Sequence, residues 1–269
     1  MLKSINSVLS LIHNALVAIA HENALKIETQ GKQGKLPSIF SFREALMTSK
    51  VSHSYDQQYY DSHYGFLLDE EYYELLSLYW KYTLFEKTGL NPEATILDYG
   101  CGLGQVSGAL DNSVAFDPSD FAKQFLAKKE RRSVKDQDSI PSGYFDYILS
   151  SHSLEHSSKP SEDLKCFRSY VKDNGKLVLL LPIETGLEPC LEPNNDQHFQ
   201  CWTFQTITNL LWHCGWKPIF QSHIYNPFLL KTLGCRLNLD QTTAVYLSAM
   251  LGRLVRSYPS QMTIAQRID

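Results

Sequence analysis

From residue 94 onward, short apolar segments alternate with amphipathic ones, and this alternation is the feature that most restricts the fold. The segment 176–181 is apolar after its first residue, which is typical of a strand that is buried on both faces of a sheet. Strands that alternate with helices of this length are usually parallel neighbours. The sequence therefore predicts an α/β fold with a doubly wound, mostly parallel sheet.

Apolar periodicity places the individual elements. The strands are expected at residues 94–99, 113–116, 144–150, 176–181, 217–225 and 262–268. The helices are expected at residues 105–110, along Phe121, Phe125 and Leu126, from Pro160 to Asn174 and Gly175, from the N-cap Thr203 to Gly215, and from Ala244 to Val255. Because Gly104 and Asp117 lie only 13 positions apart, the first of these helices should be short.

The chain divides into three regions. Residues 1–30 are expected to form an amphipathic helix, because apolar residues from Leu2 to Ile19 recur at steps of three and four. Residues 31–90 combine a polar linker with a helical cap that is rich in tyrosine. Residues 91–269 form the α/β domain, with a helical insertion at about residues 226–258 before the last strand.

The N-terminal helix has three interpretations. We favour a packing helix or a helix that joins two copies into a homodimer. Peripheral membrane contact through residues 1–20 is the second interpretation. A secretory signal is the third, although His13 and Asn14 interrupt the apolar stretch. The stretch is too short and too polar for a transmembrane segment.

Charge and cysteine content restrict the partners and the compartment. The formal net charge is −4 and the sequence pI is about 6.1, whereas proteins that bind phosphate backbones usually carry a basic surplus, so nucleic acid is not an expected partner. The six cysteines include no C-x-x-C pair. They therefore predict neither a zinc site nor a disulfide framework, and free thiols fit a cytoplasmic location.

A glycine-rich turn follows the first strand, in the run from Asp98 to Gly104. Glycines let the backbone approach a ligand closely, and free N–H groups there can bind a polar group. Nicotinamide-binding folds use similar turns. Here, however, Asp98 stands two residues before the first glycine, where a carboxylate would repel a pyrophosphate but attract the ammonium group of an amino-acid moiety.

Four motifs occur in a fixed order. They are D-x-G-C-G-x-G at 98–104, F-D-P-S at 116–119, D-x-x-x-I-P at 136–141 and F-D-x-I-x-x-x-x-x-L-E-H at 145–156. This ordered set resembles the class I S-adenosylmethionine (SAM)-dependent methyltransferases, and within them the small-molecule type with the generic methyltransferase domain. The resemblance implies a Rossmann-like fold and SAM as the cofactor. It is strong over about a third of the chain and weaker around 55–60 and 198–216.

The resemblance also implies roles for particular residues. The methionine end of SAM would lie along Gly100, Gly102 and Gly104, with Asp98 near its amino group. Asp117, followed by Pro118, would hold the ribose, and Asp136 would bind the adenine amine. Ser151 would lie beside the sulfonium. Apart from the resemblance, the tyrosine cluster is expected to be a packed helical cap, from which Tyr59 or Tyr60 could close over the cofactor.

Methyl transfer requires an acceptor lone pair aligned with the methyl carbon and needs no metal, so we expect none. An oxygen acceptor benefits from a general base, for which His152, His156 and His198 are the candidates, with His152 preferred. The alternative for each of them is a structural role, and a nitrogen or carbon acceptor would need positioning alone. Residues 226–258 resemble, weakly, the acceptor-pocket insertions of bacterial sugar and secondary-metabolite methyltransferases. We therefore expect a small-molecule acceptor, most simply a hydroxyl oxygen of such a compound.

Two other functions fit parts of the sequence. A catalytically silent SAM-binding scaffold would keep the fold without the reaction, and a nicotinamide dehydrogenase would use a related glycine turn. Asp98 and the G-C-G-L-G spacing disfavour the dehydrogenase. The segment 150–153 lacks the D/N-P-P-Y/F motif, which argues against methylation of nucleobase amino groups.

Overall fold

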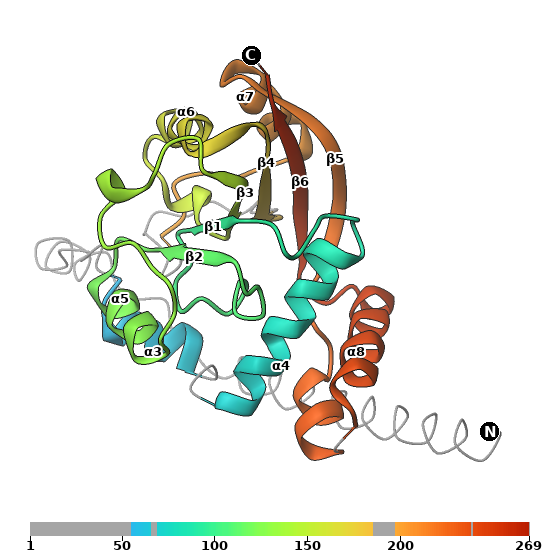
Figure 1. Cartoon of the computed structure of the whole chain (residues 1–269). Helices are drawn as coiled ribbons and strands as arrows, with labels where there is room; N and C mark the ends of the chain where they lie inside the picture. Colours follow the sequence, from blue (N-terminus) through green and yellow to red (C-terminus); the bar gives the residue numbers. More distant parts are fainter. Residues whose placement is uncertain (1–54, 66–68, 185–196, 238, 269) are drawn as a thin grey trace, which may run out of the picture. The chain divides into compact units, whose positions relative to one another are not determined.

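The computed structural model describes residues 55–65, 69–184, 197–237 and 239–268 (Figure 1). The helix predicted over residues 1–30 and the linker that follows it lie outside the described residues. No helix in the described part of the chain is long and apolar enough to cross a membrane.

Strands of the described chain form one sheet in the order β2-β1-β3-β4-β6-β5 (Figure 1). Their bounds are β1 (Ile96–Tyr99), β2 (Ser113–Phe116), β3 (Phe145–Ser151), β4 (Val171–Pro182), β5 (Trp216–Tyr225) and β6 (Pro259–Arg267). Strands β1 to β4 pair in parallel, whereas β6 runs antiparallel to β4 and to β5. The prediction of a doubly wound, mostly parallel Rossmann-like sheet is therefore confirmed.

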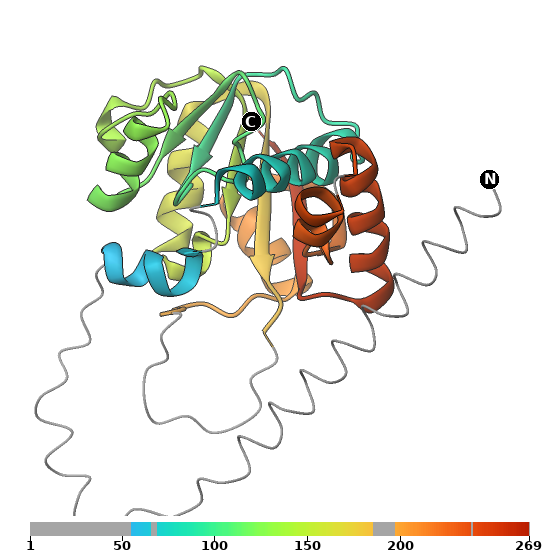
Figure 2. The ribbon, with the colours of Figure 1, turned by 90° about the horizontal axis from the view of Figure 1, so that it is seen from below.

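Helices cover both faces of this sheet. Their bounds are α3 (Gln57–Tyr64), α4 (Glu70–Trp80), the π-helical segment η2 (Lys81–Glu86), α5 (Asp120–Lys128), the single turns η3 (Gln137–Ser139) and η4 (Leu154–His156), α6 (Pro160–Tyr170), α7 (Phe204–His213), η5 (Thr232–Arg236) and α8 (Gln241–Val255). One core lies under α4 and α8, which lie next to each other at a steep angle in Figure 2, and a second core lies under α6 and α7. The tyrosine-rich cap corresponds to α3 and α4, and the helical insertion before the last strand corresponds to η5 and α8.

Strand β4 explains why the segment 176–181 is apolar throughout. Leu177 and Leu179 pack into the core under α6 and α7, whereas Val178 and Leu180 pack into the core under α4 and α8. All four side chains are fully buried. Because neighbouring residues of a strand face opposite sides, a strand with both faces covered must be apolar at every position.

Two helix predictions were wrong, one in its existence and one in its C-terminal end. The segment 105–110 forms consecutive turns and no helix, because so few residues join the glycine turn to β2 that a helix has no room to extend beyond its costly first turn. The third helix, α6, ends at Tyr170 instead of Asn174, since Val171 already has extended backbone angles and pairs with Phe145.

The strand order places a crevice at the carboxyl ends of β1 and β3. Strand β2 lies on one side of β1 and β3 on the other, so the chain changes direction across the sheet at this point. In doubly wound folds, ligands bind outside the carboxyl ends of the strands where the order reverses. The glycine turn follows β1, Asp117 follows β2, and His152 follows β3.

Candidate active site

The glycine turn has backbone conformations that side chains rarely adopt. Gly100, Gly102 and Gly104 have φ values of 70°, 54° and 74°. A Cβ atom on Gly100 would lie 1.9 Å from Oγ of Ser153, so glycine is required there both by the backbone and by the space. Gly104 instead packs against Leu126 and does not line the cavity described below.

Asp117 joins the glycine turn to the end of β2. Its Oδ2 accepts a hydrogen bond of 2.8 Å from the N–H of Gly102, and its Oδ1 accepts one of 2.8 Å from the N–H of Ser119. Burial raises the pKa of Asp117, and these two N–H groups act in the opposite direction. The carboxylate lies at the cavity wall, where it can accept further hydrogen bonds from a ligand.

Asp98 is buried beneath the turn, with 1% of its surface exposed. Neither of its carboxylate oxygens accepts a hydrogen bond of good geometry within the described residues. Burial raises the pKa of Asp98 to about 6, while the Ser107 hydroxyl and the Arg131 guanidinium lower it and Asp117 raises it further. A buried carboxylate with so little compensation favours a cationic ligand close by.

These elements border a cavity of about 890 Å³. The predicted site residues that line it are Tyr59, Gly100, Gly102, Asp117, Pro118, Ser151, His152 and His156. Asp98, Gly104, Asp136 and His198 do not line it. Asp136 is exposed, and its neighbour Gln137 faces the cavity in its place.

Tyrosines from α3 and the residues before it form one wall of the cavity. The backbone carbonyl of Tyr55 accepts a 2.6 Å hydrogen bond from the Ser119 hydroxyl, which fixes the start of this segment beside the β2 turn. The rings of Tyr59 and Tyr60 lie edge to face at 5.4 Å, and Tyr60 stacks on Phe121 at 5.2 Å. Burial, followed by Asp117, raises the pKa of Tyr60, so its hydroxyl stays protonated. The tyrosine density of the sequence predicted a helical cap here, and both tyrosines singled out from it, Tyr59 and Tyr60, line the cavity.

His152 also lines the cavity and has a φ of 47°, which is unusual for a residue with a side chain. Its Nε2 lies 3.2 Å from the Ser260 hydroxyl, and its Nδ1 lies 3.5 Å from Oε1 of Glu155. A strained backbone that holds a side chain in a cavity is a common feature of functional sites.

His156 and His198 lie close together. Their ring centroids are 4.7 Å apart. Burial lowers the pKa of His156, and the charge of Glu155 opposes this effect by raising the same pKa. His198 contacts the carboxylate of Glu184 through Nδ1 at 2.5 Å. The sequence search did not single out Glu155 or Glu184, although Glu155 stands between two of the selected histidines.

Comparisons with known proteins agree with this geometry. A family model described as a methyltransferase domain matches residues 69–221, which is more than half of the chain. No curated protein sequence matches the chain.

Solved structures of low sequence identity share the fold. The 1,6-didemethyltoxoflavin-N1-methyltransferase of Burkholderia thailandensis, solved with bound 1,6-didemethyltoxoflavin and S-adenosylhomocysteine, aligns with a TM-score of 0.51 and 16% identity over 88% of this chain and 93% of its own. A SAM-dependent methyltransferase from Thermotoga maritima aligns with a TM-score of 0.51 and 11% identity over 79% and 99%. The Haloferax volcanii protein that is in complex with the Trm112 methyltransferase activator aligns with a TM-score of 0.50 and 12% identity over 76% and 92%.

The glycine turn after β1 and Asp117 at the end of β2 both lie within the residues that the family model matches. The chain therefore belongs to the methyltransferase domain family, as a class I methyltransferase whose cofactor is SAM.

Proposed function

We propose that the protein transfers a methyl group from SAM to a hydroxyl oxygen of a small-molecule acceptor, such as a sugar or a secondary metabolite. The observation that carries this proposal is the position of His152. It lies in the same cavity as the glycine turn, with a carboxylate 3.5 Å from its Nδ1. A cavity of about 890 Å³ lies in the upper part of the range for small-molecule sites, so it has room for a cofactor and an acceptor of modest size.

The residues on the cofactor side fit SAM. Gly100 and Gly102 expose backbone at the cavity wall, where the methionine end would lie, and Gly104 supports the turn from behind. The buried charge of Asp98 would attract the ammonium group, and Asp117 would accept hydrogen bonds from the ribose hydroxyls. Asp136, which the sequence suggested for the adenine amine, does not line the cavity, whereas its neighbour Gln137 does, so Gln137 would make that contact.

The acceptor side supplies a group that can take a proton. When bound, SAM provides a methyl group on a positively charged sulfur, with a neutral thioether as the leaving group. The protein must hold the acceptor oxygen in line with that methyl group and remove the hydroxyl proton as the new C–O bond forms. His152 takes this proton, Glu155 stabilises the resulting imidazolium, and Ser260 contacts the other ring nitrogen.

The Burkholderia neighbour supports the class of acceptor, because it binds a small heterocycle beside the cofactor product. That enzyme methylates a nitrogen. The choice of oxygen for this chain therefore depends on the histidines of the cavity and not on that neighbour.

Turnover with methyl-labelled SAM and a fractionated set of small hydroxyl compounds tests the proposal. We expect label to appear in one compound class, and His152→Ala to lower kcat by about 10²–10⁴-fold with little change in the Kd for SAM. His213→Ala is a matched control, because His213 is exposed on α7 and lies outside the cavity.

Two outcomes would contradict the proposal. If His152→Ala turned over the true acceptor at the wild-type rate, His152 would not be the general base. Tight SAM binding without methyl transfer to any fraction would favour the scaffold function instead.

A further inference from the structure

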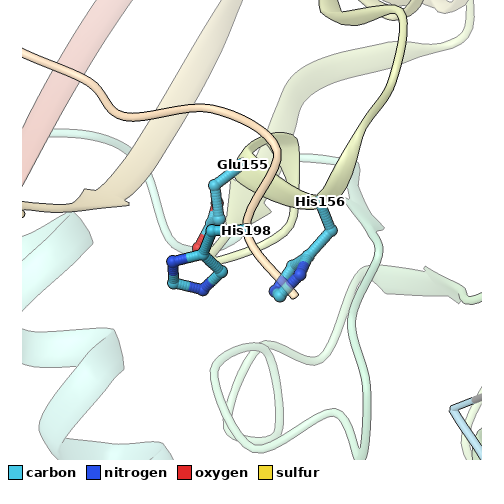
Figure 3. Close-up of side chains that lie close together, drawn as sticks. All are labelled: Glu155, His156 and His198. Atoms are coloured by element: carbon cyan, nitrogen blue, oxygen red, sulfur yellow. The ribbon is translucent and has the colours of Figure 1, made fainter. Parts of the chain in front are cut away.

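Three side chains converge behind the acceptor side of the cavity (Figure 3). Glu155 and His156 come from the single turn η4, and His198 comes from a distant segment that crosses it. One carboxylate oxygen and one nitrogen from each ring lie within 4.8 Å of one another. Bonds of about 2.0–2.2 Å to a shared cation bring such atoms to within about 4 Å of each other, so small side-chain rotations close the set.

The carboxylate of Glu155 has a strong need for a positive partner. Its side chain is completely buried, yet neither oxygen accepts a hydrogen bond from the described residues. The nearest basic group is His152, with Nδ1 3.5 Å from Oε1. Native proteins seldom bury a carboxylate without hydrogen bonds, because the loss of hydration is then uncompensated, and a bound cation supplies the missing interaction.

In each histidine, one ring nitrogen contacts another protein group and the other is available as a metal ligand. Nδ1 of His198 contacts Oε1 of Glu184 at 2.5 Å, and the Cys201 thiol donates to Oε2 of the same carboxylate at 3.3 Å. The backbone of Gln197 hydrogen-bonds the ring of His156, while Nδ1 of His156 is buried without a hydrogen-bond partner in the described part of the chain. Outer carboxylate and backbone contacts of this kind orient histidines toward a metal and fix their tautomers.

The backbone also holds the two segments together at this point. The carbonyl oxygen of Glu155 accepts hydrogen bonds from the N–H groups of Phe199 at 2.8 Å and Gln200 at 3.1 Å. His198 is therefore fixed against η4 by main-chain contacts on its C-terminal side. The cluster is a built feature of the fold and not a chance meeting of surface side chains.

We propose that Glu155, His156 and His198 bind one divalent first-row transition cation, with Zn²⁺ as the simplest example. Two imidazole nitrogens and one carboxylate oxygen form a donor set that suits such cations and leaves coordination positions open. His156 lines the cavity, so a cation held by this cluster would lie at the cavity's edge. The cation site stands on the cluster itself, and only its role in catalysis rests on the proposed function.

In that role, the bound cation coordinates the acceptor oxygen and favours its deprotonated form, and the proton passes to His152. His156 and His198 are then ligands instead of bases, which leaves His152 as the base. Methyl transfer alone needs no metal, which is why none was expected from the sequence. The requirement arises from the acceptor hydroxyl, whose proton must be lost.

Zn²⁺ binding by the metal-stripped full-length protein, measured by calorimetry and by equilibrium dialysis without SAM or acceptor, tests the site. We expect the wild type to bind one equivalent of Zn²⁺ with micromolar or tighter affinity. Glu155→Gln and His198→Ala should lose this binding, and Glu184→Gln should bind Zn²⁺ roughly 10–100-fold more weakly. His213→Ala should bind Zn²⁺ as the wild type does. Glu155→Gln removes a buried charge at constant shape, so it should remain folded, which its far-UV circular dichroism and thermal transition would report.

No Zn²⁺ binding by the folded wild type, or unchanged binding in both ligand variants, would overturn the cation site. The same metal-stripped protein should still bind SAM with unchanged Kd, because no proposed ligand lies at the glycine turn. A protein that binds Zn²⁺ at this cluster but methylates a nitrogen would disprove the proposed oxygen acceptor and leave the cation site standing.

Discussion

Asp98 should make SAM affinity depend on pH below neutrality. Its carboxyl group is buried beneath the glycine turn, and its pKa is raised to about 6 mainly by burial. Only the ionised form attracts the SAM ammonium group. At pH 5 about one molecule in eleven carries this charge, and at pH 7 about ten in eleven do, so the apparent affinity should rise about tenfold, or about 1.4 kcal/mol, between these values.

The same raised pKa has the opposite effect on the stability of the ligand-free protein. In the unfolded chain the carboxyl group ionises near pH 3.8, whereas in the folded protein it ionises near pH 6. Between these values the native state binds more protons, so the free energy of unfolding falls as pH rises, by about 3 kcal/mol for this group alone. Asp98→Asn should therefore stabilise the ligand-free protein above pH 6 while weakening SAM binding.

Calorimetric titration of SAM into wild type and Asp98→Asn at pH 5, 6 and 7 measures the first effect, and urea unfolding at the same pH values measures the second. Asp117 also titrates with a raised pKa, so the difference between the two proteins isolates Asp98. An equal pH slope in both proteins would refute the role of Asp98 as the ammonium partner.

Three further outcomes are expected. Asp117→Asn should weaken SAM binding by about 1–3 kcal/mol in calorimetry, because the variant loses charge-assisted hydrogen bonds to the ribose and loosens the Gly102 contact. Equal affinity in the folded variant would show that the ribose binds elsewhere. Gly100→Ala should abolish SAM binding and lower the midpoint of thermal unfolding, since its methyl group would meet Ser153 at a positive φ; normal affinity would mean that the turn is not the cofactor wall. Deleting residues 1–30 should leave SAM affinity intact and change the oligomeric state or the association with vesicles, which light scattering and flotation measure. Loss of SAM binding by a folded truncation would instead place this helix at the site.

The fold could be predicted because its signals are local. The apolar run of β4 and the glycine turn after β1 each follow from a few consecutive residues. The segment 105–110 was mispredicted as a helix because its apolar residues have a helical spacing. The short distance to β2 was visible in the sequence and predicted a short helix, but the segment forms only turns. Tyr170 ends α6 early, since the pairing of Val171 with β3 is a tertiary contact.

The site could be predicted only in part, because some of its contacts join distant segments. Asp117 and the turn glycines follow from position at strand ends. The meeting of Glu155 with His198, and of His198 with Glu184, depends on how the chain after β4 returns across η4. Local patterns carry no information about such a return, so the sequence named the histidines as bases and missed their carboxylate partners.

Product analysis with ¹³C-methyl SAM tests the central claim most directly. The protein is incubated with labelled SAM and a fractionated mixture of small hydroxyl compounds, and the position of the label is read by NMR. The predicted result is one product whose labelled methyl group is bonded to oxygen, formed at least about 10²-fold more slowly by His152→Ala. A labelled methyl group on nitrogen or carbon, formed at the same rate by both proteins, would contradict the account.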